Sequence, residues 1–226
     1  GKVITTVVST PMIDVVAPAK NVGVIKTLTG FKYIGEKIRQ FENKEIDGTY
    51  ILGFEESYGY LIGTHARDKD AIVSSLLIAE MAAFYNSKGT SIYKELQKLY
   101  QEFGYYLEGI KSVTLTGKDG IEKMANLMTE LRETVKDRTI DKNIKIKRDF
   151  KTKKELIVAT GEEKDILLPV ENVIQFVLED DTYITARPSG TEPKIKFYFS
   201  VNAPTKEEVE KKLNETMEKF VATLKL

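Results

Sequence analysis

The hydrophobic pattern in the first half of the chain alternates between two periods. Apolar, β-branched runs suited to strands occupy residues 2–10, 24–28 and 50–54, and the segments between them carry apolar residues at helical spacing. Strands that alternate with helices are typical of βαβ units, so this half predicts a largely parallel sheet. Pro18 is expected to make the first helix short or kinked, because proline lacks the N–H that a helix interior uses.

Two further helices are predicted before the pattern changes. Residues 70–85 are apolar nearly all round, which is typical of a buried helix rather than a surface one. Gly89 follows as a C-cap, and apolar residues at helical spacing then predict a second helix over 92–103 that Gly104 ends.

The second half predicts an antiparallel sheet backed by helices. Strand-like runs cluster at 112–115, 144–150, 173–178, 183–187 and 194–201, and capping-box patterns at Asp119 and Thr205 open two helices. Alternation along 194–201 predicts one buried and one solvated face. The fold class is therefore α/β followed by α+β, with a boundary near residues 105–112 and domains at 1–110 and 111–226.

Composition narrows the class of protein. A hydrophobic content of 42% over 226 residues is enough for a real core, and 34 basic residues balance 34 acidic ones. Neither nucleic acid nor a membrane surface is therefore an expected partner. The absence of cysteine fits a reducing compartment, so we expect the cytoplasm. The basic run 142–154 is interpreted as a solvated edge strand rather than a docking patch.

One loop concentrates groups that bind anions. Arg187–Lys194 places a guanidinium and two hydroxyls between two strands, with turn residues at Pro188, Gly190 and Pro193. Arginine presents a fork of donors that matches a phosphate, the hydroxyls add donors, and glycine lets backbone N–H groups approach. The chemistry predicts an oxyanion site, although an ordinary polar hairpin loop explains the same residues about as well.

A second loop carries groups suited to a sugar. Gly53–Gly59 follows the third strand, and ligands of open α/β sheets lie beyond the carboxyl ends of strands. A carboxylate at Glu55 and a hydroxyl at Ser57 can accept from and donate to neighbouring sugar hydroxyls. Taken alone, this segment is more typical of a solvated acidic turn.

Together these loops resemble those of the α-D-phosphohexomutases. Gly53–Gly59 is similar to that family's sugar-binding loop, with Phe54 in place of a glycine, and Arg187–Pro193 resembles its fourth-domain phosphate loop. Thr29–Gly35 looks like the loop that reads sugar identity, and the helix start at Lys69-Asp70 agrees in order and spacing. The resemblance covers essentially the whole chain.

The resemblance implies roles for particular residues. Sugar contacts fall on Glu55 and Ser57, with Gly30, Phe31 and Lys32 reading sugar identity. The phosphate loop is expected to hold the distal phosphate through Arg187, Ser189, Gly190 and Thr191. Lys69 is a further candidate for binding a substrate phosphate. Lys69 and His65 are weak candidates for proton transfer, and no metal ligand is expected.

The resemblance also implies a longer enzyme. This chain looks like domains 3 and 4 of a four-domain protein, the second of them TBP-like, and its start inside a strand-like run suggests a fragment. The expected reaction interconverts glucose 1-phosphate and glucose 6-phosphate through a phosphoserine, with Mg²⁺ and glucose 1,6-bisphosphate. The nucleophile and magnesium loops have no counterpart here, so domains 1 and 2 are expected partners and the chain alone is expected to be inactive.

Three alternatives stay open at the level of sequence. The chain could belong to a phosphomannomutase or to a phosphopentomutase, two enzymes of the same family, although Phe31 and Lys32 favour the glucose branch. The third alternative is a module that binds a sugar phosphate without catalysis.

Overall fold

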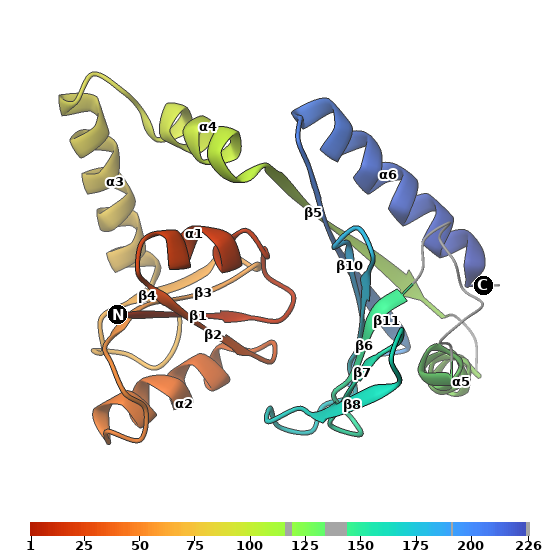
Figure 1. Ribbon diagram of the computed structural model, residues 1–226. Helices are drawn as coiled ribbons and strands as arrows, with labels where there is room; N and C mark the ends of the chain where they lie inside the picture. The colour runs from red at the N-terminus through yellow and green to blue at the C-terminus, as the bar shows by residue number, and fades with distance from the viewer. Residues whose placement is uncertain (116–118, 134–143, 191, 225–226) are drawn as a thin grey trace. The chain divides into compact units, whose positions relative to one another are not determined.

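The computed structural model describes residues 1–115, 119–133, 144–190 and 192–224. The chain divides into two compact units, Gly1–Tyr105 and Tyr106–Leu226 (Figure 1). The strand β5, Tyr105–Thr114, begins at this division and runs across the boundary at 110 that was expected from the sequence.

The first unit is built on a four-stranded sheet in the order β2-β1-β3-β4. Strand β1 pairs in parallel with β2 and β3, whereas β4 pairs antiparallel with β3. The predicted, largely parallel sheet is therefore confirmed, and β4 is an addition that the sequence pattern did not indicate. The strands are β1 Lys2–Thr6, β2 Gly23–Thr27, β3 Tyr50–Glu55 and β4 Gly59–Ile62.

Helices α1, Ile13–Ala19, and α2, Phe31–Glu42, lie on opposite faces of this sheet (Figure 1). The first helix is short and contains Pro18, as expected. The second packs Ile34 and Ile38 against the sheet, where both are fully buried. In the same core the Tyr50 hydroxyl donates to the Leu61 carbonyl at 2.6 Å, and burial raises the pKa of Tyr50 to about 12.

The helix predicted to be buried is exposed. Helix α3, Ala71–Ser87, follows β4 after the loop 63–70 and leads away from the sheet (Figure 1). Within this fully described helix only Ser74 is buried, and large apolar side chains on several sides of it are exposed: Ile72, Leu76, Leu77, Ile78, Met81 and Phe84. An apolar pattern on all sides predicts that a helix is buried, but it does not identify which residues of the chain or of another chain bury it. Helix α4, Ile92–Phe103, follows and ends at Gly104 as predicted.

The second unit is a seven-stranded sheet in the order β5-β11-β10-β9-β6-β7-β8, with α5 and α6 on one face (Figure 1). The predicted antiparallel sheet with helices is confirmed, and its β7–β8 hairpin was not predicted. Besides β5, its elements are α5 Gly120–Glu133, β6 Ile144–Asp149, β7 Lys154–Ile157, β8 Glu162–Asp165, β9 Ile174–Leu178, β10 Tyr183–Pro188, β11 Lys194–Ala203 and α6 Lys206–Thr223.

The core of this unit lies between the sheet and α6. Phe197 and Phe199 on β11 meet Phe220 of α6 edge-on, with ring centroids 5.2 and 5.6 Å apart. The capping box predicted at the start of α6 is present, because the Thr205 hydroxyl accepts from Glu208 N while the Glu208 carboxylate accepts from Thr205 N. Both the start of this helix and the core beneath it thus follow from local sequence.

The prediction of a solvated second face on β11 is wrong for most of the strand. Tyr198 and Ser200 are buried, and only Lys196 among the alternating residues is exposed. Polar contacts across strands explain the burial. The Ser200 hydroxyl donates to Glu108 at 3.1 Å, and Gln175 Nε2 donates to the Thr185 hydroxyl at 2.9 Å. Polar residues on this face bond to one another rather than to solvent.

The prediction of an edge strand at 142–154 is also wrong. Strand β6 lies between β9 and β7, because the two strands that follow it extend the sheet. Its basic residues are therefore paired: Arg148 Nε contacts Glu155 at 2.6 Å, and Lys147 Nζ donates to the Arg132 carbonyl. Burial lowers the pKa of Lys147. Among the described residues, no helix has both the length and the apolar character to cross a bilayer.

Candidate functional site

Three loops of the first unit leave the sheet at the same edge. Strands β1, β2 and β3 are parallel, so the segments that follow them emerge together at their carboxyl ends, where ligands of open α/β sheets bind. These segments include Gly30, after β2, and the tight turn 56–58, after β3. The topology therefore brings two of the sequence-predicted loops to one edge.

Glu55 is the centre of this edge. Its side chain is buried, with 6% exposed, so its charge needs partners. Oε1 accepts a hydrogen bond from the Gly30 N–H at 2.7 Å, and Oε2 lies 3.7 Å from Lys69 Nζ. The carboxylate thus joins the predicted sugar-binding loop to the predicted specificity loop through one side chain.

Lys69 completes a compact cluster with Glu55. Its Nζ lies 5.2 Å from the centroid of the Phe31 ring and 3.2 Å from Asp68 Oδ1. Gly59 makes room for this arrangement, since a Cβ there would lie 3.1 Å from Lys69 Cε and 3.4 Å from Glu55 Oε2. Four of the sequence-predicted residues are therefore brought together: Gly30, Phe31, Glu55 and Lys69.

Two predicted sugar contacts are placed differently. Ser57 is exposed on the turn between β3 and β4. The Lys32 ammonium lies over the Tyr33 ring, 4.7 Å from its centroid, so its charge contacts a neighbouring aromatic side chain of α2. Next to Gly30, the buried Thr29 hydroxyl has no hydrogen-bond partner among the described residues. A buried hydroxyl without a partner is uncommon and marks a place where a ligand could accept or donate.

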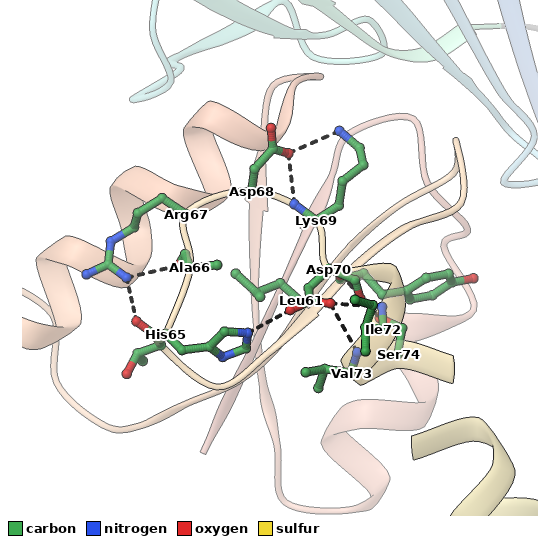
Figure 2. A network of polar contacts seen from close by, with 12 residues as sticks. Leu61, His65, Ala66, Arg67, Asp68, Lys69, Asp70, Ile72, Val73 and Ser74 are labelled. Carbon is green, nitrogen blue, oxygen red and sulfur yellow. Dashed lines mark hydrogen bonds and ion pairs between the residues drawn. The ribbon is translucent and has the colours of Figure 1, made fainter. Parts of the chain in front are cut away.

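His65 belongs to the cap of α3 rather than to the cluster around Glu55. Its Nε2 lies 2.9 Å from Asp70 Oδ2, while Asp70 Oδ1 accepts from the N–H groups of Ile72 and Val73 (Figure 2). The hydrogen bond from His65 lowers the pKa of Asp70, with help from the capped amides. Asp70 therefore fixes the start of α3 directly beside Lys69.

The loop before Lys69 is attached to α2. Arg67 donates to the carbonyls of Thr64 and Ala66 (Figure 2). It also donates to Glu42 Oε2 on α2 at 2.5 Å. At Gly35 on α2, an added Cβ would lie 2.6 Å from the Arg67 carbonyl oxygen. Sequence reasoning missed these residues, and the only signal available was a glycine inside an otherwise helical pattern.

The predicted phosphate loop lies in the second unit, between β10 and β11. Backbone bonds close it tightly: Ser189 N donates to the Lys194 carbonyl at 2.7 Å, and Glu192 N donates to the Ser189 hydroxyl at 3.3 Å. Arg187 Nε is buried and has no acceptor among the residues that the structure describes. Gly190 is exposed, and a Cβ there would meet no atom within 4 Å. Thr191 lies outside the described residues.

A second cation beside Arg187 was not predicted. Lys196 is its direct partner in the antiparallel register of β10 and β11, so the two side chains lie on one face of the sheet. Like charges directly opposite each other are unfavourable unless an anion lies between them. The alternation of 194–201 contained this information, but register cannot be read without the turn geometry.

Metal ligands do not gather anywhere in the described part of the chain. Within 1–115, 119–133, 144–190 and 192–224, no group of three His, Asp or Glu side chains could hold a metal ion. The candidate groups on these loops are therefore an acceptor at Glu55 and a donor at Arg187.

Comparison with known proteins finds relatives along most of the chain. Residues 1–103 match the family described as phosphoglucomutase/phosphomannomutase, alpha/beta/alpha domain III. A phosphoglucomutase from Staphylococcus aureus (strain MRSA252) is 35% identical over 211 residues, which is 93% of this chain. The chain spans only 38% of the length of that relative.

Solved structures share the fold. An open form of the phosphoglucomutase pp63/parafusin from Paramecium has a TM-score of 0.64 at 19% identity and matches 99% of this chain and 38% of its own. A putative phosphomannomutase from Thermus thermophilus has a TM-score of 0.53 at 17% identity, over 96% of this chain and 36% of its own. At these identities the likeness concerns the fold alone.

Proposed function

The chain belongs to the phosphoglucomutase/phosphomannomutase family, and on this premise we propose that it is the sugar- and phosphate-recognition part of a phosphoglucomutase. The complete protein would interconvert glucose 1-phosphate and glucose 6-phosphate. The observation that carries the proposal is the contact of buried Glu55 with Gly30 N–H and Lys69. It unites the two loops that the sequence assigned to sugar binding with Lys69, which was a candidate for phosphate binding or proton transfer.

Recognition of the sugar follows from the donors and acceptors around Glu55. A carboxylate accepts from sugar hydroxyls, and the exposed Ser57 hydroxyl both donates and accepts. The Lys69 ammonium lies against the Phe31 ring and contacts the Glu55 and Asp68 carboxylates, and its side chain is half-exposed, so one of its three donors can reach a substrate oxygen or phosphate. A site of this kind recognises a pair of hydroxyls without fixing which end of the sugar carries the phosphate, as a reaction that reorients its intermediate requires.

Recognition of the distal phosphate is assigned to the loop that contains Arg187. Its buried Nε donor without a described acceptor is satisfied when a phosphate oxygen accepts from it. Lys196, opposite it in the sheet, adds a second positive charge. Ser189, Gly190 and Thr191 are proposed to supply the remaining donors.

Phosphoryl transfer itself is assigned to other parts of the complete protein. We propose that a phosphoserine, the ligands of Mg²⁺ and the activator glucose 1,6-bisphosphate act with domains outside this chain, because the described residues do not fit a metal site. When bound, the metal would neutralise charge on the transferred phosphoryl group. The chain alone is proposed to bind sugar phosphates and to have no mutase activity.

Two measurements test the proposal. The complete protein is assayed with glucose 1-phosphate, mannose 1-phosphate and ribose 1-phosphate in the presence of Mg²⁺ and the matching bisphosphate. Preference for glucose 1-phosphate is expected, and a preference for mannose or ribose would move the protein to another branch of the family. The 226-residue chain is then titrated with glucose 6-phosphate, and binding is expected. The same chain is assayed for mutase activity, and turnover would contradict its recognition-only role.

A further inference from the structure

The turn between β3 and β4 is attached to the end of β1 by a side chain that the motif does not use. Glu56 lies between the two proposed sugar contacts, Glu55 and Ser57. Its Oε2 accepts from the Thr6 hydroxyl at 3.1 Å and from the Ser9 hydroxyl at 3.4 Å. Both hydroxyl residues are buried and Glu56 is half-buried, so these bonds are partly shielded from water.

The two hydroxyls also bond to each other, at 2.9 Å. Each hydroxyl has one proton to donate, and a carboxylate only accepts. With Thr6 donating to Glu56, the Ser9 proton is directed to the Thr6 oxygen or to Glu56, and every donor of the cluster is satisfied. The Val8 N–H also donates to the Thr6 hydroxyl, at 3.3 Å, which fixes the loop after β1.

The turn needs such an attachment because it is strained. Tyr58 has φ 60, in the left-handed region, although its side chain is a bulky ring that is 91% exposed. A ring so exposed gains little packing to offset this backbone conformation, which is unfavourable for a residue with a Cβ. A conformation of this kind persists only where the surrounding structure fixes it, and Glu56 joins the turn to the neighbouring strand by side-chain hydrogen bonds.

Adjacent carboxylates therefore have different tasks. Glu55 binds the loop after β2 through Gly30, and Glu56 binds the end of β1 through Thr6. We propose that Glu56, Thr6 and Ser9 form a positioning cluster for the sugar site, which holds the strained turn so that Glu55 and Ser57 present their oxygens together. This inference rests on the proposed function, and it assigns Glu56 no contact with the substrate.

The test uses the complete protein with Glu56→Ala, Glu56→Gln and Ser9→Ala. Glutamine keeps a carbonyl oxygen that accepts from a hydroxyl, whereas alanine removes the acceptor. We expect Glu56→Ala to lower kcat/KM for glucose 1-phosphate by about tenfold, and Glu56→Gln to recover most of this loss. Ser9→Ala combined with Glu56→Ala should cost little more than Glu56→Ala alone, because both remove the same interaction.

Thr27→Val is the matched control. Thr27 is a buried threonine at the end of β2, and its hydroxyl donates to the backbone carbonyls of Thr5 and Leu28 rather than to the turn. Thr27→Val should lower the melting temperature without a matching loss of kcat/KM. Glu56→Ala should lower kcat/KM without a matching loss of melting temperature. Activity losses that follow stability losses in both variants would overturn the inference, as would wild-type kcat/KM in Glu56→Ala.

Hydrogen exchange separates failure of this inference from failure of the proposed function. Amide protection of residues 56–59 is measured in wild type and Glu56→Ala, and faster exchange confined to this turn is expected in the variant. If the wild-type protein has no mutase activity, the proposed function fails. The exchange result alone then shows whether Glu56, Thr6 and Ser9 hold the turn. Unchanged protection would overturn this inference.

Discussion

Arg187 and Lys196 lie directly opposite each other on β10 and β11, with their positive charges on the same face of the sheet. The Nε of Arg187 is buried without an acceptor among the described residues. Two cations in this relation stabilise a bound anion at some cost to the empty fold. The pair is thus a proposed anion-binding feature whose effect on binding can be separated from its effect on stability by experiment.

Arg187→Ala should weaken sugar-phosphate binding by roughly tenfold or more, because charge-assisted bonds are worth about 1.5–3 kcal/mol. Arg187→Lys should recover only part of the loss, since an ammonium lacks the planar fork. Lys196→Ala should weaken binding less and leave stability without ligand unchanged or raised. Titration calorimetry and thermal unfolding check both, and equal affinity of Arg187→Ala and wild type would contradict the phosphate site.

Lys69→Met should lower kcat/KM of the complete protein by about tenfold to hundredfold, because it removes the ammonium between Glu55 and Phe31 while keeping the length of the side chain. His65→Ala is the comparison, since His65 contacts Asp70 rather than Glu55. Its effect should stay within about threefold. The two variants are compared by steady-state kinetics, and the reverse order of effects would assign proton transfer to His65.

Gly35→Ala should destabilise the first unit by about 1–3 kcal/mol. Alanine normally favours a helix by up to about 1 kcal/mol over glycine, but here its Cβ would lie 2.6 Å from the Arg67 carbonyl. Backbone gives way less easily than a side chain, so the clash should exceed the gain. Gly23→Ala is the control, because its Cβ would meet only the flexible Lys2 side chain at 3.2 Å. Chemical denaturation measures both, and a stabilised Gly35→Ala would show that the loop before Lys69 moves freely.

The start of α3 should be sensitive to acid. The pKa of Asp70 is lowered in the folded protein, mainly by the hydrogen bond from His65. The contribution of Asp70 to stability is therefore present above its unfolded pKa, and it is lost as the pH falls through the lowered value. Wild type should therefore exceed Asp70→Asn in stability near pH 5, and the difference should shrink below about pH 4. Unfolding curves at a series of pH values across this range measure the difference, and one that grows on acidification would contradict the assignment.

The exposed helix α3 should dominate the apolar surface of the isolated chain. Leu76→Glu combined with Phe84→Glu should reduce binding of a hydrophobic dye and any self-association at high concentration, with little loss of stability. Tyr93→Glu on α4 is the control, because Tyr93 is as exposed as Leu76. Equal dye binding by wild type and both variants would show that this surface lies elsewhere.

Much of the fold could be predicted because strands and helices here follow local periodicity. Ile34 and Ile38 on α2 and the alternation of Ile195, Phe197 and Phe199 identify buried faces directly. The errors concern what lies next to an element. Strand β6 is interior because the β7–β8 hairpin extends the sheet beyond it. Ser200 is buried because its hydroxyl bonds to Glu108 on another strand. Neither neighbour can be read from the residues of β6 or β11 alone.

The candidate site divides in the same way. The motifs indicated Glu55 and Arg187 because unusual chemistry stands out in a turn, and the structure joins Glu55 to Gly30 and Lys69. Lys196 and Glu56 were missed because their importance depends on which residue lies opposite or across the sheet. Pairing across strands is set by register and topology, which a single sequence does not display.

Helix α3 begins beside the proposed sugar site. It is a rod of about 25 Å whose first residue follows Asp70, next to Lys69, and whose body carries exposed apolar side chains. Because a helix moves as a rigid body, a small tilt of the body displaces the cap and with it the ammonium beside Glu55. A contact made along the exposed apolar side chains of α3 would therefore alter the position of the charge at the proposed sugar site.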